Sequence, residues 1–383
     1  MKDYIDKIIG DALNFGETVG SNCLLFKDGE EIYSGFFGYA DRESKIPMKR
    51  DTIFRLFSLS KSITSAAAMI LIDRGLLSPD DSVSRYFPEF SSLTYVEDEK
   101  ILPCPVDMKI SHLLNMTSGI PYADNWGASV RGAAKLFDEI ILGQKNGTEL
   151  TTAEICRKAA GIPLLFKPGD SWYYGISADI IGGIVEVISG MKYGEFLRKN
   201  IFEPLGMNDT GFYVPSDKLN RFAALYSWQE NGLGRDYNNY LGLTDYTKSP
   251  AFESGGAGLV STIEDYSKFA RLLANKGEFN GVRLFSEKTF EFMTTPQLNS
   301  TQLSGMWDRL KGYNYANFMR ILVEPEYSQL KTVKGEFGWD GWTGTFFCAD
   351  PANNIAVLYF TQISGAGTTK QAEFICEEVY KSL

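Results

Sequence analysis

Residues 54–62 of the chain read Phe54-Arg55-Leu56-Phe57-Ser58-Leu59-Ser60-Lys61-Ser62. The alanine-rich sequence that follows predicts a helix from about Ser58 to Asp73. Residues three positions apart share a helix face, so we expect the hydroxyl of Ser58 and the amine of Lys61 to meet. The apolar neighbours would bury Lys61 and lower its pKa, as a base acting near neutral pH requires. The stretch therefore predicts a serine nucleophile activated by a lysine.

Histidine is nearly absent, which limits the alternatives. The chain has one histidine, His112, and no Gly-x-Ser-x-Gly stretch. A Ser-His-Asp triad would have to use His112, and a site with several histidine ligands for a metal is excluded. We interpret His112 as a structural residue inside a helix. The Ser-x-x-Lys spacing alone is weak evidence, because it recurs at Ser189–Lys192 and Ser328–Lys331, where we interpret it as coincidence.

The bulk composition excludes several classes of function. The 383 residues carry a formal net charge of −10, which disfavours nucleic acid and an anionic membrane surface. No apolar run approaches the length of a membrane span, and Met1–Leu13 has the spacing of an amphipathic helix rather than of a cleaved leader. The five cysteines are widely spaced and form no Cys-x-x-Cys pair, so we expect reduced thiols and a cytoplasmic protein.

The order of the expected elements indicates an α+β fold. Hairpins are predicted at 20–39 and at 345–361, and a closing helix at about 369–383. The segments between them predict mostly helices, at 110–115, 132–142, 152–159, 177–189, 193–200 and 263–275. We expect one catalytic unit over 1–383, with an antiparallel sheet built from the N- and C-terminal segments and flanked by helices. Residues 1–80 with about 225–383 would form the sheet region, and about 81–224 an inserted, mostly helical subdomain.

Several segments, in order along the chain, carry a family resemblance. They are the Ser58–Lys61 stretch, His112-Leu-Leu-Asn-Met-Thr-Ser-Gly119, Phe166-Lys-Pro-Gly169, residues 201–210 (IFEPLGMNDT) and residues 255–265 (GGAGLVSTIED). Together they resemble the serine β-lactamase and penicillin-binding protein family, especially its class C-like branch, although Met116 replaces a histidine of the family pattern. That branch includes D-aminopeptidases, D-Ala-D-Ala carboxypeptidases and family VIII carboxylesterases. The resemblance implies the β-lactamase/transpeptidase-like fold.

The second motif of this family is Tyr-x-Asn, and Tyr174 stands at the matching tyrosine. The resemblance implies that Tyr174 faces Ser58 and Lys61, relays the serine proton to the leaving group and later activates water. The neighbouring Tyr173 is the alternative candidate for this role. Ile176 replaces the family's asparagine, which removes an amide that usually helps to position the lysine and amide substrates. The resemblance implies that Ile176, like Trp339, Asp340 and Gly341, lies at the bound substrate.

The third motif of the family appears as Trp339-Asp340-Gly341. We expect Gly341 to let the strand approach bound substrate closely, because it has no side chain. The resemblance implies that the backbone N–H groups of Ser58 and Trp342 form the oxyanion hole. Many relatives have a basic residue in this motif that holds a substrate carboxylate. Trp339 has no charge to supply, and Asp340 would repel an anion.

These departures favour neutral esters over carboxylate-bearing lactams and peptides. Tyr122, Trp126, Phe252 and Trp307 are candidates to line an aromatic cleft. The expected function is a serine esterase acting through an acyl-enzyme on a small-molecule ester or amide, with no metal or organic cofactor. The alternatives are a β-lactamase or D-Ala-D-Ala carboxypeptidase or D-aminopeptidase, an acyltransferase, and a relative that binds a ligand without turnover. The oligomeric state stays open.

Overall fold

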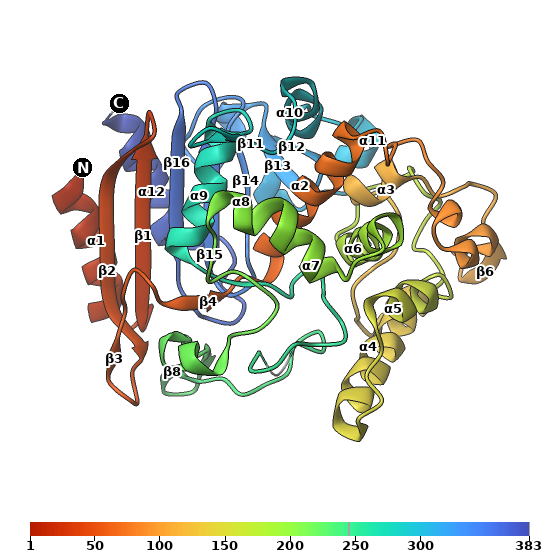
Figure 1. Cartoon of the computed structure of the whole chain (residues 1–383), viewed down its shortest axis with the longest axis horizontal. Coiled ribbons are helices and arrows are strands. Elements are labelled where there is room, and N and C mark those ends of the chain that lie inside the picture. The colour runs from red at the N-terminus through yellow and green to blue at the C-terminus, as the bar shows by residue number, and fades with distance from the viewer. Residues whose placement is uncertain (244–245, 383) are drawn as a thin grey trace.

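A large antiparallel sheet forms one side of the molecule (Figure 1). The computed structural model describes residues 1–243 and 246–382. The sheet has eight strands in the order β12-β13-β14-β15-β16-β1-β2-β3. Their bounds are β1 Gly20–Lys27, β2 Glu30–Asp41, β3 Ile46–Pro47, β12 Tyr313–Ala316, β13 Met319–Leu322, β14 Phe337–Asp340, β15 Thr345–Asp350 and β16 Ile355–Phe360. The predicted sheet from the two ends of the chain is confirmed, because β1 pairs with β16 in the register Cys23↔Tyr359.

Helices cover both faces of this sheet. The first helix, α1 (Lys2–Asn14), and the last, α12 (Lys370–Lys381), lie side by side on one face, where the terminal amine of Met1 pairs with Glu378 at 3.2 Å (Figure 1). On the other face, α9 (Ile263–Ala274) packs on β15, β16 and β1. The strands β15 and β16 are buried along their whole length, as expected for strands covered on both faces.

The remaining helices stand beside the sheet and surround α2 (Ser60–Asp73). Twelve of the fourteen residues of α2 are buried, so it forms the centre of the helical part. It packs against α6 (Ser177–Ser189) and α10 (Glu287–Thr294). The other helices are α3 Ile110–Leu114, α4 Ala128–Asn146, α5 Thr152–Ala159, α7 Tyr193–Leu197, α8 Glu203–Leu205 and α11 Ser300–Leu303. Shorter ladders join β4 (Ile53–Arg55) to β9 (Val260–Thr262), β5 (Thr94–Glu97) to β6 (Lys100–Pro103), β7 (Tyr226–Gln229) to β8 (Gly232–Arg235), and β10 (Glu278–Phe279) to β11 (Val282–Arg283).

Most predicted elements are present, with shifted ends. Both predicted hairpins form, as β1–β2 and β15–β16. The helix expected to begin at Ser58 begins at Ser60, because residues 57–59 form a short 3-10 helix. The hairpin β12–β13 was not predicted; its eight residues are all buried, so it lacks the alternation that marks a half-buried strand. The predicted closing helix ends at residue 381, and residue 383 lies outside the described residues. The division into subdomains at about residues 80 and 225 stays a prediction.

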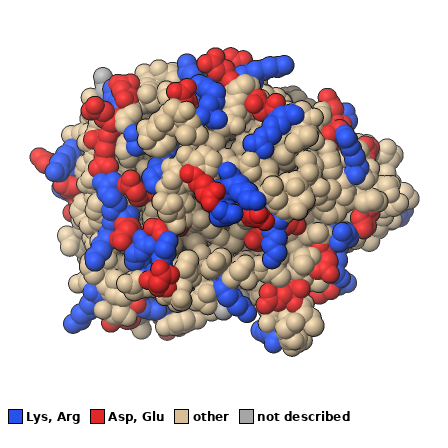
Figure 2. Space-filling view, in the orientation of Figure 1, with Lys and Arg blue, Asp and Glu red and all other residues tan. Residues whose placement is uncertain are grey.

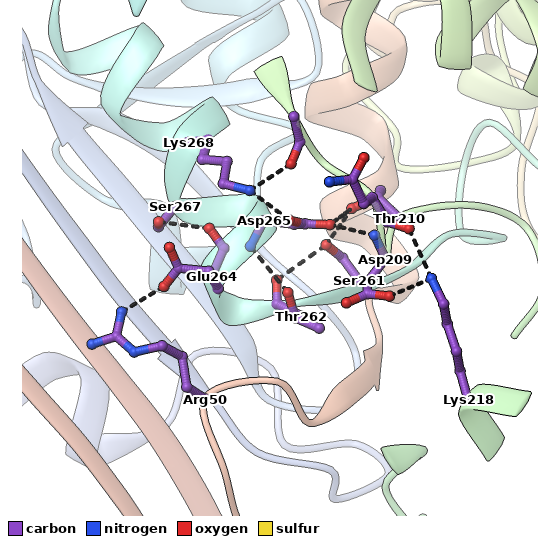
Figure 3. Close-up of polar contacts among 12 residues, drawn as sticks. Arg50, Asp209, Thr210, Lys218, Ser261, Thr262, Glu264, Asp265, Ser267 and Lys268 are labelled. Carbon is purple, nitrogen blue, oxygen red and sulfur yellow. Dashed lines mark hydrogen bonds and ion pairs between the residues drawn. The ribbon is translucent and has the colours of Figure 1, made fainter. Parts of the chain in front are cut away.

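Two of the segments that carry the family resemblance meet in a polar network (Figure 3). The carboxylate of Asp265, in 255–265, accepts a hydrogen bond from the backbone N–H of Asp209, in 201–210, at 2.6 Å. Lys268 pairs with the same carboxylate at 2.9 Å. Asp265 lies in the first turn of α9, where the positive end of the helix dipole stabilises its negative charge. The network ties the helical part of the chain to the sheet and fixes β9, which precedes α9.

The surface carries charge of both signs. On the face seen in Figure 2, lysine and arginine side chains are interspersed with aspartate and glutamate, without an extended basic area. No helix within residues 1–243 or 246–382 is long and apolar enough to cross a membrane.

Candidate active site

Ser58 lies in the 3-10 helix η1 (Phe57–Leu59), directly before α2 and against strands β14 and β15 of the large sheet. The residue before it, Phe57, is buried and has a left-handed backbone with φ of 45°. This conformation costs a residue with a side chain about 1–2 kcal/mol. Surrounding contacts hold it: the backbone of Leu56 donates to the carbonyl of Leu259 at 2.9 Å, and the carbonyl of Leu56 accepts from the hydroxyl of Thr345 at 3.0 Å. The serine is therefore presented by a strained turn clamped from two sides.

Lys61 lies on α2, one turn beyond Ser58, and is completely buried. Its amine donates to the hydroxyl of Ser58 at 3.1 Å, to the hydroxyl of Tyr122 at 2.9 Å and to the carbonyl of Gly256 at 2.7 Å. Burial lowers the pKa of Lys61 to about 7, against the opposing charges of Asp179 and Asp340. The expected meeting of Ser58 and Lys61 is present, and burial favours the neutral amine that a base requires.

Tyr174 lines the same cleft as Ser58. Its hydroxyl accepts the indole N–H of Trp339 at 3.0 Å, and its ring stacks on that indole at 5.5 Å. The amine of Lys61 lies 4.6 Å from the centre of the same ring. Burial raises the pKa of Tyr174, while hydrogen bonds with Ser58 and Trp339 oppose the rise. Of the two candidate tyrosines, Tyr174 lines the cleft beside Ser58, and Tyr173 is not among the described residues that line it.

Two further residues at Lys61 were not predicted in this role. Tyr122 was expected only as a cleft wall, yet its hydroxyl contacts Lys61, and burial raises its pKa well above the usual value. Asp179, on α6, accepts the hydroxyl of Ser254 at 2.5 Å and the N–H of Gly256 at 3.0 Å. It thereby fixes the loop whose carbonyl binds Lys61. Its own pKa is raised by burial, which outweighs these bonds and the charge of Lys61.

The third motif approaches the serine from the sheet. A side chain at Gly341 would meet the carbonyl of Leu56 at 2.2 Å, so the glycine admits the backbone next to Ser58. The expectation that Gly341 lets the strand approach bound substrate stays a prediction. The next residue, Trp342, lines the cleft, and the centre of its ring lies 5.4 Å from the centre of the Phe57 ring. The backbone N–H of Trp342 has no acceptor among the described residues, and its part in an oxyanion hole stays a prediction.

A cleft of about 500 Å³ opens in front of Ser58. Its described lining residues are Phe57, Ser58, Tyr122, Tyr174, Tyr240, Leu241, Trp307, Arg309, Trp339, Asp340, Trp342, Gly365, Ala366 and Gly367. Of the predicted cleft residues, Trp126 and Phe252 are absent from this set. Ile176, predicted at the substrate, is buried in the main hydrophobic core instead. Asp340 faces the cleft but is paired with Arg309 at 3.2 Å, a partner that the sequence interpretation missed.

The two other Ser-x-x-Lys matches and His112 make structural contacts. The amine of Lys331 donates to the backbone carbonyl of Ser328 at 2.7 Å, and the hydroxyl of Ser189 donates to the carbonyl of Val185 at 2.6 Å. Neither hydroxyl has a lysine as its hydrogen-bond partner among the described residues. The imidazole Nδ1 of His112 accepts the N–H of Lys109 at 3.1 Å and so caps α3.

Comparison with known proteins assigns the family. The family model described as Beta-lactamase matches residues 5–375. The chain belongs to the β-lactamase family. This β-lactamase-family chain is 32% identical over 369 residues to Protein Rv1367c of Mycobacterium tuberculosis, covering 92% of the chain and 88% of that protein. It is 29% identical over 380 residues to Esterase EstB of Burkholderia gladioli, covering 95% of the chain and 91% of EstB.

A solved structure agrees over the whole β-lactamase-family fold. EstCE1, described as a hydrolase with promiscuous acyltransferase activity, superposes with a TM-score of 0.83 at 26% identity, covering 99% of this chain and 98% of EstCE1.

Proposed function

We propose that this chain is a serine hydrolase that cleaves carboxylic esters through an acyl-enzyme on Ser58. The observation that carries the proposal is the 3.1 Å hydrogen bond between Ser58 and a buried Lys61 whose pKa is lowered to about 7. A neutral amine at that distance can take the serine proton as the hydroxyl attacks. Esterases and hydrolases among the relatives support ester cleavage and a small-molecule substrate.

In the acylation step, the oxygen of Ser58 attacks the ester carbonyl and its proton passes to Lys61, with Tyr174 beside both groups. The negative oxygen of the tetrahedral intermediate is stabilised by the backbone N–H groups of Ser58 and Trp342. Two such donors commonly contribute about 3 kcal/mol each to the transition state. The intermediate then expels the alcohol, which takes the proton from Tyr174 while Lys61 returns a proton to the tyrosine.

In the deacylation step, water attacks the acyl group on Ser58 and its proton passes to Lys61, which is neutral again, with Tyr174 beside both groups. The acid then leaves as the oxygen of Ser58 takes that proton back from Lys61. The hydrogen bond from Trp339 to Tyr174 stabilises negative charge on the phenol oxygen as it develops. The raised pKa of Tyr174 keeps the phenol protonated between turnovers, so it can act as the acid for the leaving alcohol.

The cleft favours esters over lactams and D-amino-acid peptides. Its walls are mostly aromatic, and the third-motif position that is basic in many relatives is occupied by Trp339, whose N–H is already bound to Tyr174. A panel of p-nitrophenyl esters tested beside nitrocefin and a D-Ala-D-Ala peptide decides the matter. We expect kcat/KM to be highest for the esters. Faster hydrolysis of nitrocefin or of the peptide would contradict the ester preference and favour the lactamase or peptidase alternative.

Acyl transfer is a second candidate, favoured by the acyltransferase activity of EstCE1. An alcohol that reaches the acyl-enzyme replaces water in the deacylation step and yields a new ester. Turnover of p-nitrophenyl butyrate with added 1-propanol would release propyl butyrate, measurable by gas chromatography. The absence of propyl butyrate during rapid p-nitrophenol release would exclude transfer to this alcohol. We also propose a cytoplasmic location, which the five unpaired cysteines support.

A further inference from the structure

One charged pair interrupts the aromatic wall of the cleft. Among the described residues that line it, only Arg309 and Asp340 carry a formal charge. Arg309 comes from the 3-10 helix η6 (Asp308–Leu310), which precedes β12, whereas Asp340 ends β14. Placing charges in a mostly apolar wall costs desolvation energy, which favours a role for the pair beyond packing.

The guanidinium of Arg309 is held in place on two sides. It lies 4.7 Å from the centre of the Trp307 ring, and its Nη1 donates to Oδ2 of Asp340 at 3.2 Å. The hydroxyl of Thr368 donates to the same oxygen at 2.5 Å, so Asp340 is itself fixed. An arginine stacked on an indole and tied by one nitrogen loses little further freedom when it binds a ligand.

The rest of the guanidinium remains open to the cleft. Its Nε and Nη2 have no hydrogen-bond acceptor among the described residues. The side chain of Arg309 is 44% exposed, whereas that of Asp340 is 12% exposed. The carboxylate is therefore recessed behind the cation, and a group entering the cleft meets the positive charge first.

Gly367 supplies space beside this cation. Its φ is 55°, and a side-chain carbon there would lie 3.3 Å from Nη1 of Arg309 and 3.7 Å from Oδ2 of Asp340. The glycine thus leaves the guanidinium uncovered on the side of the cleft wall that residues 365–367 form. A planar ligand can approach Arg309 along this wall.

We propose that Arg309 forms a carboxylate subsite, so that the preferred substrates are esters that also carry a free carboxylate. The inference rests on the proposed ester hydrolysis at Ser58. The planar guanidinium matches a carboxylate through two parallel hydrogen bonds, which neutral acceptors cannot reproduce. The expectation of neutral esters was drawn from the third motif alone, where Trp339 stands. The cation comes instead from η6, at a different place in the wall, so this proposal replaces neutral esters by esters that carry a carboxylate.

The test compares each carboxylate substrate with its neutral isostere. For the acyl side, the p-nitrophenyl monoester of adipic acid is paired with the p-nitrophenyl ester of adipamic acid. For the alcohol side, 4-acetoxybenzoate is paired with 4-acetoxybenzamide. In one of the two series, we expect kcat/KM of the wild-type enzyme to be about tenfold or more higher for the carboxylate. The series that shows the preference identifies which side of the ester carries the group.

In Arg309→Gln, the ratio between carboxylate and isostere should fall to about one, and Arg309→Lys should retain part of it. Arg283→Gln is the matched control, because it removes the same charge from β11, which does not contribute to the described cleft lining. A ratio near one in both wild-type series, or a ratio unchanged in Arg309→Gln, overturns the subsite while leaving ester hydrolysis intact. If no ester of either series is hydrolysed and Ser58 takes up no fluorophosphonate, the proposed function itself fails.

Discussion

Replacing Trp339 by phenylalanine removes one hydrogen bond at the catalytic centre and keeps an aromatic ring in the wall. The indole N–H donates to the Tyr174 hydroxyl at 3.0 Å, and no other described residue donates to that oxygen from the sheet. A hydrogen bond to a group that becomes charged contributes about 1.5–3 kcal/mol. If Tyr174 carries negative charge in the transition state, kcat/KM should fall about 10- to 100-fold. The smaller ring should also cost about 1–3 kcal/mol of stability.

The assay is kcat/KM for p-nitrophenyl butyrate, with the thermal unfolding midpoint measured in parallel to separate catalysis from stability. Trp307→Phe is the matched control. Its ring lies 5.0 Å from that of Tyr174 in the same cleft, but no hydrogen bond joins it to the Tyr174 hydroxyl. We expect a smaller loss in Trp307→Phe than in Trp339→Phe. Equal losses in the two variants, or no loss in Trp339→Phe, would refute the assignment of charge to Tyr174.

Three more predictions concern Lys61. The neutral amine of Lys61 is the active form, and the pKa of Lys61 is about 7. We therefore expect kcat/KM to rise tenfold per pH unit below pH 7 and to level off above it. A flat profile from pH 5 to 8 would contradict this. Asp179→Asn removes a charge that favours the ammonium, so this midpoint should move to lower pH, and an unmoved or higher midpoint would argue against it. Tyr122→Phe removes a hydroxyl bound to Lys61 and should lower kcat/KM about tenfold, whereas Tyr173→Phe should not; equal values for the two variants would dismiss Tyr122.

The meeting of Ser58 and Lys61 could be predicted because it follows from local helix geometry, even though the helix starts two residues later than expected. Tyr174 required the resemblance, since a lone tyrosine carries no local signal. Gly256 and Asp179 could not be predicted. The contact between Lys61 and Gly256 joins residues 195 positions apart, and only the folded chain brings them together.

The same limit applies to charges and to strands. Asp340 was interpreted as a free negative charge because its partner, Arg309, lies 31 residues earlier in another element. The hairpins at 20–39 and 345–361 were predictable, because each has its own turn sequence. The hairpin β12–β13 turns through Asn317 and Phe318, both with left-handed backbones, and a bulky phenylalanine is an unusual residue for such a position.

The proposed mechanism depends on a covalent acyl-enzyme at Ser58. Mass spectrometry of the intact folded protein after exposure to a fluorophosphonate, followed by peptide mapping, tests whether Ser58 is the nucleophile. We expect one added group per chain, located on Ser58, with much slower labelling in Lys61→Met and none in Ser58→Ala. Folded wild-type protein that stays unlabelled, or that carries the group on another residue, would contradict it.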